Sequence, residues 1–303
     1  MVLRAGVAGA GVMGRNHARC YSLVEGTELT AVYDADPGRA RAVAEEFGGE
    51  VVDSLEALAD SCDLASVAVP TVAHLAVGGD LMRRGVHILM EKPIAPTVEE
   101  AQELVGLAKE HNRILKVSHI ERFNPVMREL EAKLKYPKFI EAHRLSPFPN
   151  RSVDIGVVLD LMIHDLEIIL HLVKSSVVSI DAVGVPVLMK TEDIANARLR
   201  FENGCVANVT ASRISQERLR KVRVFQDDGH LSLDYQQQSG EMYWKEGGAI
   251  QKARVEVEKD EPLKLELAAF AKSVREAKTP DVTGEHGANA LAIALEIIRK
   301  ING

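Results

Sequence analysis

A glycine-rich turn near the N-terminus constrains the fold of this chain more than any other feature. Residues 9–14 read Gly-Ala-Gly-Val-Met-Gly and fit the pattern Gly-x-Gly-x-x-Gly. An apolar run over residues 2–8 predicts a buried strand before the turn, residues 16–23 predict a helix after it, and residues 29–33 predict a second strand that ends at Asp34. This order of strand, glycine turn, helix, strand and acidic residue is typical of the βαβ unit that binds a dinucleotide.

Each glycine of the turn has its own expected role. Gly9 allows a tight turn, Gly11 lets the backbone approach a pyrophosphate, and Gly14 lets the helix pack closely on the strand. Val12 and Met13 complete the turn, and the helix that follows directs the N–H groups of its N-terminus at the phosphates. The sequence therefore predicts that these five residues bind the cofactor.

Asp34 bears on which dinucleotide is bound. A carboxylate at this position can accept hydrogen bonds from both ribose hydroxyls and repels a 2′-phosphate, which favours NAD over NADP. Arg39 and Arg41 follow and could instead reach a phosphate, although they also fit the solvated face of a helix over residues 37–47. We therefore expect NAD as the cofactor.

The composition excludes several classes of protein. The 303 residues suffice for two domains, and the net charge of −7 with 4% aromatic residues argues against a nucleic-acid partner. No apolar run is long enough to span a bilayer, and the N-terminus lacks the pattern of a signal peptide. The cysteines are three in number and far apart, which is typical of a reducing compartment. We expect a cytoplasmic protein with no membrane partner.

Strands and helices alternate as far as residue 118. Further strands are expected over residues 50–52, 64–69, 86–90 and 114–117, and further helices over residues 54–59, 71–84 and 97–111, the last capped by Thr97. Six strands separated by helices predict a doubly wound parallel sheet, the Rossmann architecture. We assign residues 1–119 to an NAD-binding Rossmann domain.

The pattern then changes to a run of strands. Helices are expected over residues 124–134, 157–173, 263–277 and 286–301. Strands are expected over residues 139–144, 177–185, 195–201, 205–212, 221–226, 230–234 and 241–245, with hairpin signals at Asn203-Gly204 and Asp228-Gly229. This predicts an α+β domain with an open, mostly antiparallel sheet. We assign residues 120–303 to it.

Lys92 lies in the sequence Glu91-Lys92-Pro93, directly after the strand expected over residues 86–90. Ligands of open α/β sheets bind beyond the carboxyl ends of the strands. A cationic amine at that place can stabilise alkoxide character on an alcohol that is being oxidised. The alternative is a surface lysine in a turn. The proline that follows predicts a rigid turn, whose Lys–Pro peptide bond can be cis, and this favours a lysine side chain held in position.

Asp160 and His164 are four residues apart on the helix expected over residues 157–173, and so lie on one face. Histidine can take a proton from an alcohol near neutral pH, and a carboxylate can orient it. The alternatives are a structural pair, or two metal ligands that lack a third partner in the sequence. We expect catalysis without a metal, and we expect Asp165 and Glu167 on the solvent side.

Basic residues mark a possible anion site. Arg122 and Asn124 follow the last strand of the first domain, and Arg213 ends a strand of the second. In an acidic protein a local basic cluster suggests an anionic ligand, whereas its alternative is a solvated strand face. Further members of the cluster are Arg218, Arg220, Lys221 and Arg223.

These motifs, in this order, resemble the glucose-fructose oxidoreductase / inositol dehydrogenase (Gfo/Idh/MocA) family. They are the glycine turn, Val69-Pro70-Thr71 with His74, Glu91-Lys92-Pro93, Gly156-x-x-x-Asp160-x-x-x-His164-Asp165 and a pattern over residues 261–284. The resemblance implies an NAD-dependent oxidoreductase with Lys92, Asp160 and His164 as its catalytic set. It implies that Pro70, Thr71, His74 and Glu91 join the cofactor site, and that the open face of the second sheet forms a homodimer or homotetramer.

Within the family, residues 119–125, 153–157 and 212–218 resemble the UDP-N-acetylglucosamine 3-dehydrogenases. Those enzymes make a 3-keto sugar for a partner aminotransferase in lipid A biosynthesis. The resemblance implies a nucleotide-sugar substrate, and we expect Arg122, Asn124 and Arg213 to contact it. The alternatives are a dehydrogenase of a free sugar or cyclitol, and a non-catalytic NAD-binding sensor.

Overall fold

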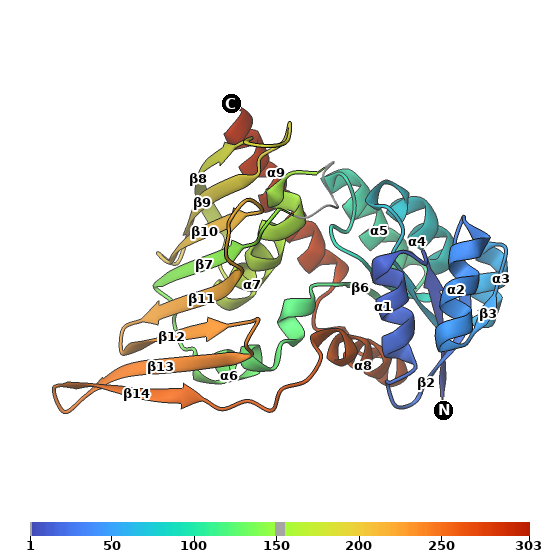
Figure 1. The fold of residues 1–303 in the computed structure, drawn as a ribbon, viewed down its shortest axis with the longest axis horizontal. Coiled ribbons are helices and arrows are strands. Elements are labelled where there is room, and N and C mark those ends of the chain that lie inside the picture. The colour runs from blue at the N-terminus through green and yellow to red at the C-terminus, as the bar shows by residue number, and fades with distance from the viewer. Residues whose placement is uncertain (1, 149–154) are drawn as a thin grey trace. The chain divides into compact units, whose positions relative to one another are not determined.

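The computed structural model describes residues 2–148 and 155–303, which form two compact units (Figure 1). Unit 1 extends to Ile120 and also includes Glu261–Asn289, whereas unit 2 comprises Glu121–Asp260 and Ala290–Gly303. The sequence-based boundary at residue 119 assumed that each domain is one continuous segment, and so did not place residues 261–289 with the first domain. Val153 and Asp154, within one stretch of the subfamily resemblance, lie outside the described residues.

Unit 1 contains a six-stranded parallel sheet of order β3-β2-β1-β4-β5-β6. The order reverses between β1 and β4, which is the doubly wound arrangement, so the expected Rossmann sheet is confirmed. Its strands are β1 (Leu3–Ala8), β2 (Thr27–Tyr33), β3 (Glu50–Val51), β4 (Leu64–Val67), β5 (His87–Met90) and β6 (Leu115–Val117).

The helices of unit 1 begin where local chemistry favours it. The Thr97 side chain accepts a hydrogen bond from the Glu100 N–H at 3.2 Å, which confirms the expected cap. The first helix starts at Val12 rather than residue 16, because it continues directly from the glycine turn. The helices are α1 (Val12–Tyr21), α2 (Pro37–Phe47), α3 (Leu55–Ser61), α4 (His74–Arg83), α5 (Val98–Glu110) and α8 (Pro262–Glu276), with a 3₁₀ turn over Thr71–Ala73.

Helix α8 joins unit 1 through its apolar face. Leu267 and Phe270 are fully buried in one cluster with Ala18 and Tyr21 of α1. Burying one large apolar side chain contributes about 1.5–3 kcal/mol. A segment from the C-terminal part of the chain therefore stabilises the helix that starts at the glycine turn.

Unit 2 contains an eight-stranded sheet of order β14-β13-β12-β11-β7-β10-β9-β8. Neighbouring strands are antiparallel except β7 and β10, which confirms the expected open, mostly antiparallel sheet. Its strands are β7 (Phe139–Leu145), β8 (Val177–Val185), β9 (Ile194–Phe201), β10 (Val206–Ser212), β11 (Leu219–Gln226), β12 (Gly229–Asp234), β13 (Ser239–Glu246) and β14 (Ala249–Val255).

The edge strand β14 was not expected from the sequence. Gly247 and Gly248 both have positive φ, at 57° and 85°, and form the turn between β13 and the antiparallel β14. Most of β14 is exposed, so its apolar residues do not follow the alternation that marks a half-buried strand.

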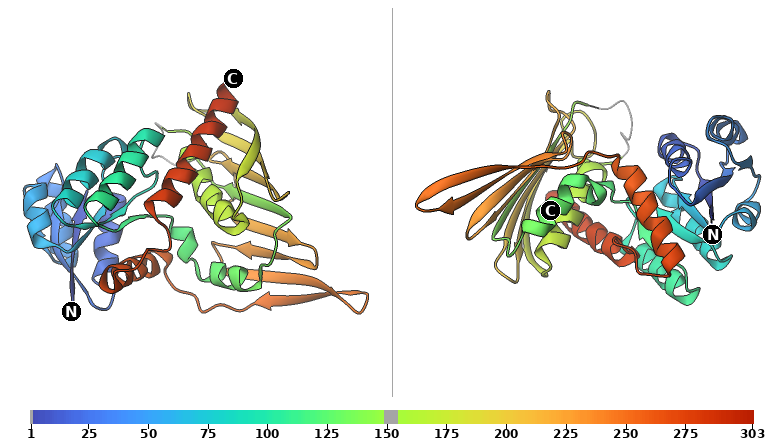
Figure 2. Two further views of the ribbon diagram at one scale, coloured as in Figure 1. Left: turned by 180° about the vertical axis from the view of Figure 1, so that it is seen from behind. Right: turned by 90° about the horizontal axis from the view of Figure 1, so that it is seen from below.

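Helices cover one face of this sheet, as Figure 2 shows. They are α6 (Pro125–Lys133), α7 (Ile163–Val173) and the later part of α9 (Gly284–Asn302). The single helix expected over residues 157–173 is instead a π-helical turn, Val158–Met162, followed by α7. Across the described ranges, no helix has both the length and the apolar character needed to cross a bilayer.

Candidate functional site

The three glycines of the turn differ in what surrounds them. A Cβ atom on Gly9, whose φ is +96°, would lie 2.6 Å from the Ala68 carbonyl oxygen, and one on Gly14 would lie 1.6 Å from the Gly9 oxygen. A Cβ on Gly11 would meet no atom of the described chain within 4 Å. The fold therefore requires Gly9 and Gly14, whereas Gly11 leaves open space at the start of α1. That space fits a pyrophosphate lying against the helix N-terminus.

Asp34 links the end of β2 to this turn. Its Oδ2 accepts a hydrogen bond from the Ala10 N–H at 2.6 Å, and its Oδ1 accepts one from the Asp36 N–H at 2.8 Å. A carboxylate has about four lone-pair sites, so acceptor capacity remains for ribose hydroxyls. Arg39 and Arg41 are exposed on α2, and Arg39 lies 3.5 Å from Asp36, which matches the solvated-face alternative.

Lys92 follows β5 at the carboxyl edge of the parallel sheet, and the Lys92–Pro93 peptide is cis. His74, at the start of α4, connects the loops on either side: its Nδ1 lies 3.1 Å from the Ile94 oxygen and its Nε2 lies 3.1 Å from the Val69 oxygen. Burial lowers the pKa of His74, although its contacts with the two carbonyl oxygens oppose the shift. Pro70 and Thr71 follow β4 at the same edge.

A buried polar network lies beside Lys92. Glu91 Oε1 is 2.8 Å from His17 Nε2, and Glu91 Oε2 accepts the Lys92 backbone N–H at 3.2 Å. His17 Nδ1 is 2.7 Å from Ser66 Oγ, which is 2.9 Å from the Tyr21 hydroxyl. Burial raises the pKa of Glu91, but the His17 hydrogen bond and the Lys92 charge outweigh it and hold that pKa below its usual range. The ionised Glu91 side chain thus holds the backbone at Lys92 in place.

Sequence reasoning missed His17, Ser66 and Tyr21. All three are fully buried. The sequence did carry a signal for two of them: His17 lies on the apolar face of a predicted helix, and Ser66 lies within an apolar predicted strand. Because a buried polar group requires a partner, such positions indicate a buried hydrogen bond.

A second cluster of buried polar side chains lies on β6, on the residue that follows it and on α8. The Ser118 hydroxyl donates to Glu266 Oε2 at 2.8 Å, and Lys116 is fully buried nearby. Burial raises the pKa of Glu266 to about 7, although the Lys116 charge opposes the shift.

Asp160 and His164 belong to unit 2, whereas Lys92 belongs to unit 1. Asp160 lies in the π-helical turn and donates its N–H to the Gly156 oxygen at 3.1 Å, and His164 is in the first turn of α7. Short π-helical turns occur frequently at functional sites. The catalytic roles of the three residues stay predictions.

The expectation that Asp165 and Glu167 face solvent is wrong, since both are 2% exposed. Arg144 donates to both oxygens of Asp165, at 2.7 and 3.0 Å, and Arg122 Nη1 lies 2.8 Å from Glu167 Oε1. Arg144 is on the helix-covered side of β7, and the sequence around α7 gives no sign of that partner.

Arg213 does not have the surroundings expected of a substrate ligand. It is 0% exposed, and its Nε donates to Asp193 Oδ1 at 2.8 Å while Nη1 donates to the Ile155 oxygen at 2.7 Å. Arg213 thus joins segments within unit 2, and its expected contact with the substrate stays a prediction.

Asn124 and Arg122 are also held by protein partners. Asn124 Nδ2 donates to the Tyr235 oxygen at 2.9 Å, and its Oδ1 accepts the Val126 N–H at 3.4 Å as the cap of α6. On β11, Lys221 and Arg223 alternate with buried valines, so the solvated-face alternative fits these two. Arg220 instead lies 3.4 Å from the buried Glu121.

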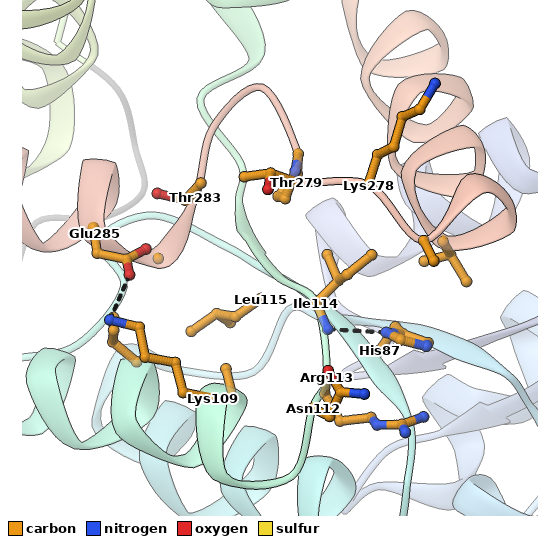
Figure 3. A pocket seen from close by; sticks show the side chains of 16 residues that line it. His87, Lys109, Asn112, Arg113, Ile114, Leu115, Lys278, Thr279, Thr283 and Glu285 are labelled. Carbon is orange, nitrogen blue, oxygen red and sulfur yellow. Dashed lines mark hydrogen bonds and ion pairs between the residues drawn. The ribbon is translucent and has the colours of Figure 1, made fainter.

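The described residues contain no cluster of three histidine, cysteine, aspartate or glutamate side chains suited to a metal ion. A pocket of about 500 Å³ lies in unit 1 at the amino ends of β5 and β6 (Figure 3). In it, Lys109 and Glu285 form an ion pair at 2.9 Å, and His87 Nδ1 accepts the Ile114 N–H at 2.9 Å. The glycine turn and Lys92 lie at the opposite, carboxyl edge of this sheet, so the pocket is not the expected cofactor site.

Comparison with known proteins agrees with the geometry of both units. Residues 3–119 match the model of an oxidoreductase family described as having an NAD-binding Rossmann fold, and residues 128–232 match the GFO/IDH/MocA C-terminal domain. The expectation that unit 1 is an NAD-binding unit is therefore confirmed.

Individual relatives point to the same family. The chain is 35% identical over 302 residues to the UDP-N-acetylglucosamine 3-dehydrogenase of Acidithiobacillus ferrooxidans, covering 97% of this chain and 96% of that protein. A solved structure of that enzyme superposes with a TM-score of 0.95 over 99% of this chain and 97% of its own. Inositol 2-dehydrogenase 1 of Saccharopolyspora erythraea is 39% identical over 132 residues, 41% of this chain and 39% of that protein. The chain thus belongs to the GFO/IDH/MocA family of oxidoreductases.

Proposed function

We propose that this protein is an NAD-dependent dehydrogenase that oxidises the 3-hydroxyl of a UDP-N-acetyl sugar, such as UDP-N-acetylglucosamine, to the 3-keto sugar. The observation that carries the proposal is the 35% identity to a UDP-N-acetylglucosamine 3-dehydrogenase over 97% of the chain. The similarity to inositol 2-dehydrogenase 1 extends over only 41% of the chain, so it supports a free sugar or cyclitol as the second candidate substrate.

The residues around the glycine turn would hold the cofactor. Gly11 leaves open space, in which the pyrophosphate would lie against the N–H groups of Val12 and Met13, and Asp34 would accept hydrogen bonds from the ribose. When bound, NAD supplies the hydride acceptor. In the proposed division, residues 1–119 bind NAD and residues 120–303 bind the sugar.

Three side chains would carry the remaining chemistry. His164 removes the proton from the sugar hydroxyl as a general base, and Asp160 orients its imidazole or stabilises the resulting cation. Lys92 stabilises the negative charge that develops on the hydroxyl oxygen. The hydrogen bond from Lys92 N–H to the buried Glu91 carboxylate holds the backbone at this lysine in place.

The similarity to UDP-N-acetylglucosamine 3-dehydrogenase also supports a proposal for the oligomeric state and for the use of the product. The face of the unit 2 sheet away from α6 and α7 carries a stack of Phe225, His230 and Tyr243, with ring centroids 4.9 and 4.5 Å apart, and would join copies into a homodimer or homotetramer. The 3-keto product would pass to an aminotransferase, on the way to lipid A, in the cytoplasm.

A substrate panel tests the proposal. Values of kcat/KM with NAD are measured for UDP-N-acetylglucosamine, free N-acetylglucosamine and myo-inositol, by the absorbance of reduced nicotinamide. We expect the nucleotide sugar to react best. A preference for either free compound would establish the second candidate, and NAD binding with no turnover of any of them would favour a sensor.

A further inference from the structure

Two buried ion pairs lie close to His164 on helix α7. Asp165 accepts two hydrogen bonds from Arg144 of β7, and Glu167 pairs with Arg122 at 2.8 Å. The four side chains of these pairs are between 3% and 7% exposed. Both pairs therefore lie in the interior of unit 2, where charges interact strongly and need each other.

The pairs bracket His164 around the axis of the helix. Successive residues of an α-helix are rotated by about 100°, so Asp165 lies about 100° from His164 on one side and Glu167 about 60° on the other. A helix held at two such directions cannot rotate without separating a buried charged pair. The direction in which the His164 side chain leaves α7 is therefore set by the ion pairs of Asp165 and Glu167.

Arg144 is itself fixed from several elements. Its Nη1 donates to Glu121 Oε1 at 3.1 Å, and Glu121 also lies 3.4 Å from Arg220 of β11 and 3.2 Å from Asn124. Burial lowers the pKa of Arg144, but the carboxylates of Asp165 and Glu121 outweigh this and keep the guanidinium charged. Asp165 is thus paired with a charged guanidinium that has a second carboxylate partner, Glu121.

We propose that Asp165 and Glu167 are positioning residues for His164, acting through Arg144 and Arg122. The inference rests on the base role of His164 proposed above. It gives Arg122 a part in the reaction without substrate contact. A general base must lie within hydrogen-bond reach of the proton that it removes, and a displacement of about 1 Å can cost about 10²-fold in rate.

The test uses the nearly isosteric variants Asp165→Asn and Glu167→Gln. Each should lower kcat about 10–100-fold, while the KM for UDP-N-acetylglucosamine and the dissociation constant for NAD change less than about twofold. The control is Glu141→Gln, which removes an ion pair with Arg223 on the opposite face of β7, and should leave kcat unchanged. Wild-type kcat in both test variants would overturn the proposal.

A double-variant cycle separates positioning from general structural damage. In a His164→Ala background, Asp165→Asn should cause no further loss of kcat, because it acts through the missing histidine. The same loss in both backgrounds would overturn the proposal. If Asp165→Asn does not fold, Glu167→Gln gives the same cycle. Wild-type kcat in His164→Ala alone would instead refute the base role itself, and the proposal with it.

Discussion

The imidazole of His17 and the carboxylate of Glu91 lie 2.8 Å apart in the interior of unit 1. His17 belongs to α1, the helix that begins at the glycine turn, and Glu91 directly precedes Lys92. One buried hydrogen bond therefore connects the helix that follows the glycine turn to the loop of the proposed catalytic lysine. The pair explains why Glu91 can remain charged while it is almost fully buried.

Replacing His17 by alanine should destabilise unit 1 strongly. The change leaves the Glu91 carboxylate buried without its main partner, and breaking a buried pair in this way costs about 3–5 kcal/mol. Urea unfolding measures the effect. Arg39→Ala, which removes a largely exposed ion pair with Asp36, is the control and should cost less than about 1 kcal/mol. Equal, small losses would show that the His17 contact contributes little.

Gly11→Ala should weaken NAD binding, whereas Gly14→Ala should destabilise the fold. Gly11 has φ of −71°, and a Cβ there meets nothing in the described chain, so alanine should leave the melting temperature unchanged but weaken NAD binding. Gly14→Ala places a Cβ 1.6 Å from the Gly9 oxygen, so it should destabilise the fold itself. Thermal unfolding and fluorescence titration with NAD distinguish the two. Unchanged NAD affinity in Gly11→Ala would contradict the pyrophosphate position.

The carboxylate of Asp34 should make NAD bind at least about ten times more tightly than NADP, a difference of about 1.4 kcal/mol. Its charge opposes a 2′-phosphate, and its hydrogen bonds to Ala10 and Asp36 hold it in place. Titration of both cofactors by fluorescence checks this. Equal affinities would indicate that Arg39 binds the phosphate instead.

Glu266 should make folding stability fall as the pH rises. Its folded-state pKa of about 7 exceeds the ordinary value, so the folded state holds a proton that the unfolded state releases. Its contribution is fully present below pH about 4 and is lost progressively between there and pH about 7. Lys116, Glu91 and His17 are the titratable groups that act on it.

Urea unfolding across that pH range should show a shallower decline for Glu266→Gln than for the wild type. The comparison between the two proteins cancels the contributions of other carboxyl groups. An identical pH dependence would mean that the pKa of Glu266 is the same in the folded and unfolded states.

The parallel sheet and the glycine turn could be predicted because their signals are local. The segments that form β1, β4 and β5 are mostly apolar, and the glycine pattern of the turn lies within residues 9–14. The polar networks could not be predicted in this way. Asp165 and Arg144 are 21 positions apart, and Glu91 and His17 are 74 apart, so only the folded chain brings them together.

The same limit applies to the protein partner of Arg213. An arginine at the end of a strand in a basic stretch resembles an anion ligand. Its charge is instead met by Asp193, 20 positions earlier, on the segment that precedes β9. Buried charges are paired as a rule, but a single sequence does not identify the partner.

Identification of the product tests the central claim most directly. The protein is incubated with NAD and UDP-N-acetylglucosamine, and the sugar nucleotide is examined by mass spectrometry and NMR while reduced nicotinamide is measured. We expect the sugar to lose two hydrogen atoms, with a carbonyl at C3, in step with the nicotinamide that is reduced. An unchanged sugar nucleotide, or oxidation at another carbon, would contradict the account.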